Sequence, residues 1–133
     1  MERRALTLEL VEGRYAVCRL GPGESVPGWA QGGPFVSVTR TDAELSVVCL
    51  QQSVPADACA ERGWCSLRVR GPLGFGLTGI LASLASPLAS SGVSIFVVST
   101  YDTDYLMVQE RDLDRAKDAL GRAGHTLEPP GAG

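Results

Sequence analysis

The chain has 133 residues, of which 44% are hydrophobic and 20% are charged, a balance typical of globular proteins and not of disordered ones. Its formal net charge of −3 provides no clustered basic face, so nucleic-acid binding is not expected. The densest group of basic residues, Arg62, Arg68 and Arg70, is interpreted as the solvated side of a strand.

The sequence shows neither an export signal nor a membrane span. The N-terminal residues are charged, and acidic residues and Gly13 interrupt the apolar run behind them, which argues against a signal peptide. The longest apolar-looking stretch, residues 80–98, is broken by serines, Pro87 and Gly92. We therefore expect a cytoplasmic protein with no membrane partner and with reduced cysteines.

No metal site or cofactor is expected. The four cysteines include no C-x-x-C pair, and His125 is the only histidine, so the ligand spacing of a zinc site is missing. Cys18 and Cys49 lie inside apolar runs and are interpreted as small core residues. The glycine-rich segment 71–79 lacks the lysine of a phosphate-binding loop.

The first half of the chain is interpreted as a degenerate repeat of the second half. Residues 41–48 match residues 101–108 at an offset of 60: both segments have two acidic residues in a turn, followed by apolar residues at the same positions. Residues 20–22 repeat residues 70–72 at an offset of 50, so the first copy lacks about ten residues where its first helix would lie. Only residues 25–30 stand in its place.

The second half predicts a strand, a loop and a helix. Residues 66–70 alternate between apolar and basic side chains, as a half-buried strand does, and residues 71–76 form a loop. An apolar stripe predicts a helix over 77–91, which should kink or re-form at Pro87 and end at Gly92. The stripe consists of Leu77, Ile80, Leu81, Leu84 and Leu88.

A hairpin and a second helix complete the pattern. Residues 94–100 and 105–109 are expected to pair across a turn, Asp112 to cap a helix that ends at Gly124, and residues 125–127 to form a last strand. The order β-α-β-β-α-β is that of a ferredoxin-like sandwich. We predict an α+β fold of two tandem ferredoxin-like units: 1–62 with a shortened first helix, and 63–128, followed by a flexible tail, 129–133.

Two motifs carry a resemblance to a known family. They are Gly71-Pro-Leu-Gly-Phe-Gly-Leu-Thr-Gly-Ile80 and Ser99-Thr-Tyr-Asp-Thr-Asp104. Together they resemble the ACT-domain proteins, in particular small bacterial tandem-ACT proteins and the ACT repeats of eukaryotic cytosolic arginine sensors. The similarity is strong over residues 64–123 and weaker over residues 15–60.

The resemblance implies a non-catalytic regulatory module that binds a small molecule, usually an amino acid. ACT units commonly join edge to edge, so a homodimer and a regulated protein partner are implied as well. In the family the ligand lies between the loop after the first strand and the end of the second strand. Carried over, one wall of the pocket is Gly74, Phe75, Leu77, Thr78, Gly79 and Ile80, and the other is Thr100, Tyr101, Asp102 and Asp104.

The chemistry of these residues suits an α-amino acid. The glycines let backbone amides approach a ligand, and a helix start directs free N–H groups at a carboxylate. Asp102 and Asp104 would hold an ammonium group by charge-assisted hydrogen bonds. The arginine-sensing relatives carry an acidic residue at the position of Leu77, so a less cationic ligand than arginine is implied here.

Plainer interpretations remain open. The glycine loop suits a tight strand-to-helix connection, Asp102 and Asp104 suit a hairpin turn, and Tyr101 would either stack on a ligand or cap the core. A small isomerase or cyclase using Asp102 or Asp104 is the enzymatic alternative, although His125 has no nucleophile near it in sequence. The third alternative is a structural dimer that has lost ligand binding.

Overall fold

The computed structural model describes residues 5–71 and 79–130 and divides the chain into two compact units. The N-terminal unit is Gly13–Trp64. The C-terminal unit joins the described residues up to Glu12 with those from Cys65 onward. This division differs from the expected units 1–62 and 63–128 because the first strand belongs in part to the C-terminal unit.

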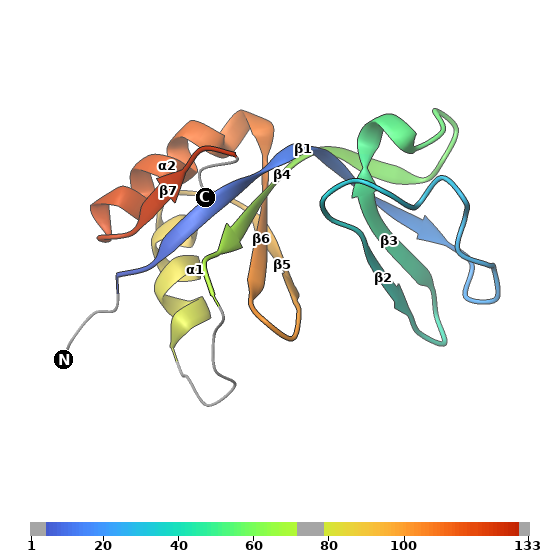
Figure 1. Ribbon diagram of the computed structural model, residues 1–133, viewed down its shortest axis with the longest axis horizontal. Helices are drawn as coiled ribbons and strands as arrows, with labels where there is room; N and C mark the ends of the chain where they lie inside the picture. Colours follow the sequence, from blue (N-terminus) through green and yellow to red (C-terminus); the bar gives the residue numbers. More distant parts are fainter. Residues whose placement is uncertain (1–4, 72–78, 131–133) are drawn as a thin grey trace. The chain divides into compact units, whose positions relative to one another are not determined.

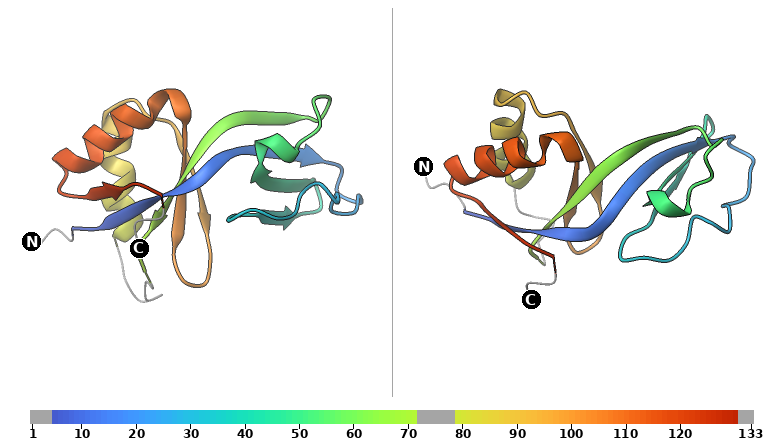
Figure 2. Two further views of the ribbon diagram at one scale, coloured as in Figure 1. Left: turned by 45° about the horizontal axis from the view of Figure 1, so that its top comes forward. Right: turned by 90° about the horizontal axis from the view of Figure 1, so that it is seen from above.

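The C-terminal unit has the predicted α+β order and is a ferredoxin-like sandwich (Figure 1). Its sheet has the strand order β7-β1-β4-β6-β5, and α1 and α2 cover one face of it (Figure 2). The elements of this unit are the first part of β1 (Thr7–Leu20), the second part of β4 (Ala60–Val69), α1 (Ile80–Ser90), β5 (Ile95–Ser99), β6 (Asp104–Gln109), a 3-10 turn (Glu110–Asp112), α2 (Leu113–Arg122) and β7 (Thr126–Glu128).

Strand β1 occupies a place that the sequence did not predict. In a ferredoxin-like unit the fourth strand lies beside the first, but here β1 lies between β4 and β7. The amide of Arg70 donates to the carbonyl of Thr7 at 2.8 Å, and β1 runs parallel to β7 with Leu8 opposite Leu127. The C-terminal unit therefore depends on residues at the start of the chain.

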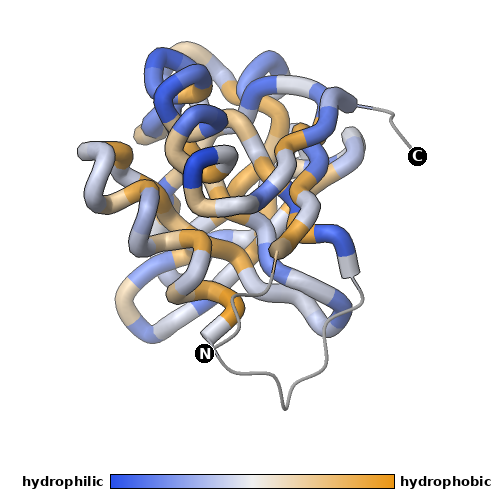
Figure 3. The backbone as a smooth tube through the Cα atoms, turned by 90° about the vertical axis from the view of Figure 1, so that its left-hand side faces the viewer, coloured by the Kyte–Doolittle hydropathy of each residue, from blue (hydrophilic) through white to orange (hydrophobic). Residues whose placement is uncertain are grey.

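The core of the C-terminal unit confirms the predicted helix phase. Ile80, Leu84 and Leu88 are the buried residues of α1, while Leu81 faces outward. They pack against inward-facing side chains of the sheet, and hydrophobic segments gather inside this unit (Figure 3). Besides Leu6, which precedes β1, the sheet and α2 supply Leu8, Cys65, Leu67, Val69, Leu106, Val108, Ala116, Ala119 and Leu120.

Helix α1 continues through Pro87 instead of re-forming there. Proline has no N–H, so the carbonyl of Ser83, four residues earlier, loses its helical donor. The Nε2 of His125 lies 3.1 Å from this carbonyl, and the Nδ1 of His125 accepts from the amide of Leu6 at 3.1 Å. These partners fix the neutral tautomer with hydrogen on Nε2, so the only histidine of the chain replaces a missing helix bond.

Both helices end as the sequence predicts, at a glycine in the left-handed region. Gly92 has φ +74° and Gly124 has φ +95°. The next amides, those of Val93 and His125, donate back to the carbonyls of Leu88 and Leu120 at 3.0 and 2.9 Å. This pattern is the Schellman motif, which favours glycine at the left-handed position. Asp112 lies at the N-cap of α2 but makes no capping side-chain hydrogen bond.

The N-terminal unit keeps the ferredoxin-like strand order without its helices. Its sheet has the order β2-β3-β1-β4, with β2 spanning Ser37–Arg40 and β3 spanning Leu45–Leu50. Within residues 13–64 the only helical element is a 3-10 turn, Gln51–Ser53, and residues 25–30 contain a single turn, in which the amide of Ala30 donates to the carbonyl of Pro27. The expected shortening of the first helix therefore extends to the loss of both helices.

The small core of this unit includes the two cysteines assigned to it. Cys18 and Cys49 are buried beside Ala16, Leu45 and Val47, and Trp29 packs against the same cluster. All four cysteines are free thiols. Burial, with a contribution from neighbouring Cys49, raises the pKa of the Cys18 thiol to about 11. The Cys18 side chain is therefore uncharged at neutral pH and a poor nucleophile.

The internal repeat is present, but its register differs by one residue from the predicted one. β3 and β6 begin at residues 45 and 104, and β2 and β5 end at residues 40 and 99, so the offset is 59. At this offset Val47 and Cys49 correspond to Leu106 and Val108, which face their cores in the same way. An offset of 60 would place these side chains on opposite faces of the sheet.

Candidate ligand site

The β5–β6 turn, residues 100–103, carries one predicted wall of the site. The amide and the hydroxyl of Thr100 both donate to the carbonyl of Thr103, at 2.8 and 3.0 Å. The hydroxyl of Thr100 also accepts from the amide of Thr103 at 3.3 Å. These bonds fix the turn locally, so that Tyr101 and Asp102 lie at its exposed tip.

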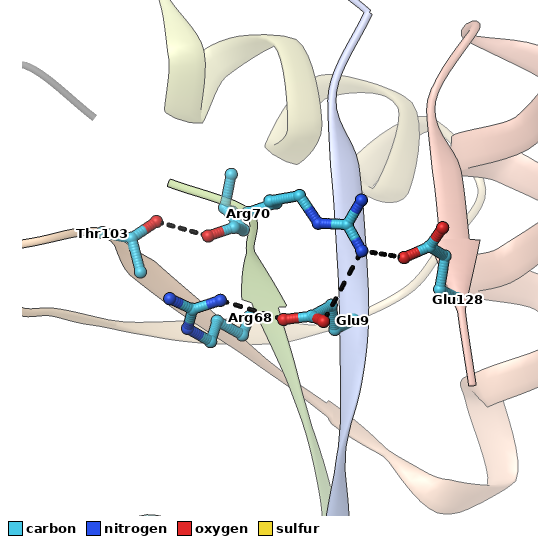
Figure 4. A network of polar contacts seen from close by, with 6 residues as sticks. Glu9, Arg68, Arg70, Thr103 and Glu128 are labelled. Carbon is cyan, nitrogen blue, oxygen red and sulfur yellow. Dashed lines mark hydrogen bonds and ion pairs between the residues drawn. The ribbon is translucent and has the colours of Figure 1, made fainter. Parts of the chain in front are cut away.

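Thr103 connects this turn to the end of β4, a contact that the sequence analysis missed. Its side chain is buried, and its hydroxyl donates to the carbonyl of Val69 at 2.6 Å (Figure 4). Val69 is the last residue of β4, just before the connection to α1. The turn with the acidic residues is therefore tied to the point where the glycine-rich segment begins.

The other side of this strand end is held by charged residues. Arg70 forms ion pairs with Glu128 on β7 and, at 3.6 Å, with Glu9 on β1 (Figure 4). The same Glu9 carboxylate pairs with Arg68 at 2.9 Å. Arg68 and Arg70 were predicted as the solvated side of a strand, and the structure adds their carboxylate partners, Glu9 on β1 and Glu128 on β7.

The start of α1 provides the described part of the second wall. Gly79 is its N-cap with φ +75°, a conformation that favours glycine, and a Cβ at this position would have no neighbour within 4 Å. The first turn of α1 has no acidic residue and no side-chain cap. The side chain of Ile80 is only 7% exposed and belongs to the core, so Ile80 would meet a ligand through its backbone.

The predicted site residues have different environments. Tyr101 is 82% exposed and does not cap the core, while Thr100 and Asp102 are exposed beside it. Asp104 is half-buried, and its Oδ1 accepts from the hydroxyl of Ser99 at 2.6 Å. The remaining predicted residues, Gly74, Phe75, Leu77 and Thr78, lie outside the described residues.

A separate depression of about 580 Å³ lies in the N-terminal unit. It is lined by Arg14, Gln51, Gln52, Arg62 and Gly63, none of which was predicted. Arg62 donates to the carbonyls of Gln51 and Pro55 at 3.2 and 2.8 Å, so its guanidinium holds the turn after β3. The depression is therefore built around a structural arginine.

The described residues lack two further kinds of feature. No group of three or more histidine, cysteine or acidic residues is placed to hold a metal ion. No described helix has the length and apolar character needed to cross a membrane.

Comparison with protein families assigns both units. A model described as an ACT domain matches residues 60–122, which include β4, both helices and the acidic turn. A second model, described as an N-terminal domain, matches residues 13–57. Residues 60–122 of this chain therefore form an ACT domain. The match to the ACT domain and the observed sandwich confirm the resemblance inferred from the two motifs.

Solved structures support the fold of this ACT protein. A crystal structure of an Agobacterium tumefaciens protein is 45% identical, with a TM-score of 0.90, and the match covers 96% of this chain and 95% of that one. The ligand-free regulatory subunit of aspartate kinase from Thermus thermophilus is 14% identical, with a TM-score of 0.60, over 90% of this chain and 99% of that one. The second likeness concerns the fold alone.

Curated relatives include proteins named cytosolic arginine sensor for mTORC1 subunit 1. The Bos taurus protein is 40% identical over 99 residues, or 66% of this ACT chain, and the Mus musculus protein is 31% identical over 97 residues, or 67%. The chain spans only about 30% of the length of these relatives.

Proposed function

We propose that this ACT protein binds a free α-amino acid and acts as a regulatory sensor without catalysis. The observation that carries the proposal is the attachment of the acidic turn to the end of β4 through Thr103 and Val69. This attachment supports a site in which the glycine-rich segment and α1 lie on one side of the ligand and the turn lies on the other.

The chemistry of the two sides supports a zwitterionic ligand. The uncapped first turn of α1 offers backbone N–H groups and the positive end of the helix dipole to a carboxylate. Asp102 and Asp104 offer negative charge to an ammonium group. We place the ligand between these two groups, with Gly74, Phe75, Leu77, Thr78, Gly79 and the Ile80 backbone on one side, and Thr100, Tyr101, Asp102 and Asp104 on the other.

The environments of the histidine and of two buried cysteines support binding over catalysis. Both ring nitrogens of His125 are engaged by the backbone, and Cys18 and Cys49 are buried with raised pKa values that burial causes. An enzyme that uses Asp102 or Asp104 is the second candidate. We further propose that the protein acts in the cytoplasm as a homodimer and that ligand binding changes its association with a regulated partner.

The test begins with thermal-shift measurements against the twenty proteinogenic L-amino acids. A ligand at a hundred times its Kd stabilises the folded state by about 2.7 kcal/mol, which raises the Tm by several degrees. We expect at least one amino acid to do so. If none shifts the Tm at millimolar concentration, the sensor function is wrong and the structural-dimer alternative gains support.

Asp104→Asn tests the site itself. The amide keeps an oxygen that can accept from Ser99, but it removes the charge that an ammonium group requires, so affinity should fall about thirty-fold or more. Calorimetry with the amino acid that gives the largest shift measures the loss. Asp118→Asn, an exposed change on α2, is the matched control and should leave affinity unchanged. Equal affinities of both variants would reject the assignment of Asp104.

A further inference from the structure

The depression in the N-terminal unit lies where three elements meet. Arg14 comes from β1, Arg62 and Gly63 come from β4, and Gln51 and Gln52 come from the 3-10 turn after β3. Strands β1 and β4 are neighbours in the sheet (Figure 1). The volume of the depression, about 580 Å³, lies within the usual range of small-molecule sites. The depression is therefore large enough to hold a small organic molecule.

The polar groups around this depression are mainly hydrogen-bond donors. Among the described residues that line it, two are arginines, two are glutamines and none is acidic. A guanidinium has five N–H donors and no acceptor, and each glutamine amide has two N–H donors. The proposed amino-acid site differs in charge, because Asp102 and Asp104 supply negative charge there. The depression therefore suits an anion, whereas the acidic turn suits a cation.

Two of these side chains are held in place by the backbone. The guanidinium of Arg62 donates to the carbonyls of Gln51 and Pro55 at 3.2 and 2.8 Å. Carbonyls are uncharged acceptors, so these bonds position the cation without neutralising it. The amide of Gly63 donates to the Oε1 of Gln51 at 2.8 Å, which leaves the N–H groups of the Gln51 side chain available to a ligand. Groups that are already fixed lose little conformational entropy when a ligand binds.

We propose that this depression binds a small organic anion through a phosphate or carboxylate group. Arginine recognises both groups with pairs of parallel N–H···O bonds. The anionic group lies against Arg14 and the amides of Gln51 and Gln52, and Arg62 adds a fixed positive charge. The volume of about 580 Å³ leaves room for an organic body beside the anionic group. This site is separate from the proposed amino-acid site, because it lies in the other unit and takes a ligand of different charge.

The glutamines make the location of binding measurable. The chain has no asparagine and four glutamines, Gln31, Gln51, Gln52 and Gln109. NMR spectra of the isotope-labelled full chain therefore contain few side-chain amide signals. Titration with pyrophosphate and, separately, with citrate should move the Gln51 and Gln52 signals with one common Kd below about 1 mM. The Gln31 signal should stay in place, and sodium chloride at matched ionic strength controls for screening.

The two probes distinguish the two kinds of anionic group. A response to pyrophosphate alone assigns the site to phosphates, and a response to citrate alone assigns it to carboxylates. Equal responses show that the site recognises charge, and each of these three results supports the proposal. If neither anion at about 10 mM moves the Gln51 and Gln52 signals beyond the sodium chloride control, the proposal is wrong. Since no amino acid is added, the result is independent of the amino-acid screen.

Two charge-changing variants with matched controls test the lining residues. Gln52→Glu places a negative charge in the depression and should weaken anion binding about ten-fold or more, whereas Gln31→Glu, the same change on an exposed residue of the same unit, should not. Arg14→Gln should weaken binding by a similar factor, and Arg122→Gln, on an exposed residue of α2, is its control. Melting temperatures confirm folding. Unchanged binding in both lining variants, or equal losses in their controls, would overturn the assignment.

Discussion

Thr103 shows how one hydroxyl can organise a site that its sequence context does not indicate. In the motif Ser99-Thr-Tyr-Asp-Thr-Asp104, the acidic residues attract attention because their charges suit a ligand, while Thr103 looks like a turn residue. In the structure Thr103 is the buried member, and its bond to Val69 connects segments 34 residues apart. Long-range bonds of this kind leave no periodic signal in a sequence.

Replacing Thr103 separates the effect of its hydroxyl from that of its shape. Thr103→Val keeps the branched side chain but leaves the carbonyl of Val69 without this donor, which should cost about 1–3 kcal/mol of unfolding free energy. Thr103→Ser keeps the donor and should lose less. Urea denaturation of the two variants measures the difference. If serine destabilised the protein as much as valine, the hydrogen bond would not be the source of the stability.

At the level of elements, the phase of α1 was predicted correctly, whereas the sequence left open whether the helix kinks or re-forms at Pro87; it does not re-form. The stripe of Ile80, Leu84 and Leu88 follows the helical period, so its buried face could be derived from spacing alone. The continuity of the helix through Pro87 could not be derived from spacing, because the donor that replaces the missing N–H comes from His125, 42 residues from Ser83. Sequence reasoning identified the problem at the Ser83 carbonyl but not its solution.

A double-mutant cycle on Pro87 and His125 tests this compensation. His125→Ala should destabilise the protein by about 1–3 kcal/mol, because buried groups of Leu6 and Ser83 lose their partner. In a Pro87→Ala background the new amide can donate to Ser83, so the same change should cost measurably less, with a coupling of about 0.5 kcal/mol or more. Strictly additive losses in thermal or urea unfolding would contradict the replacement of one donor by the other.

On the scale of the whole molecule, the two units share the long strands β1 and β4, each of which belongs to one unit in its first part and to the other unit in its second part. Element order and fold class followed from the sequence because apolar periodicity and glycine stops are local signals. The place of β1 between β4 and β7 did not follow from the sequence, because strand pairing is non-local and several strand orders are compatible with the same apolar pattern. Expected boundaries at residues 62 and 63 therefore missed the contribution of the first strand to the C-terminal unit.

The dependence of the C-terminal unit on β1 predicts how fragments should behave. A fragment of residues 63–130 lacks Leu6 and Leu8, both buried in its core, and the carbonyls of Leu6 and Thr7 that accept from Thr126 and Arg70. Loss of one fully buried leucine costs about 2–5 kcal/mol, which is comparable to the whole stability of a small domain. This fragment should therefore be largely unfolded, with poorly dispersed amide resonances.

The matched control restores the strand and omits the N-terminal unit. Thr7 faces Arg70 and Arg19 faces Cys59 in an antiparallel ladder, so residues near 12 and 65 lie opposite each other. A chain in which residues 13–64 are replaced by a two-residue Asn-Gly turn should close β1 and β4 into a hairpin and fold. Dispersed amide resonances and a cooperative melt are expected for this chain only. A folded 63–130 fragment would show that β1 is dispensable, and an unfolded control would show that the N-terminal unit is required for more than joining the two strands.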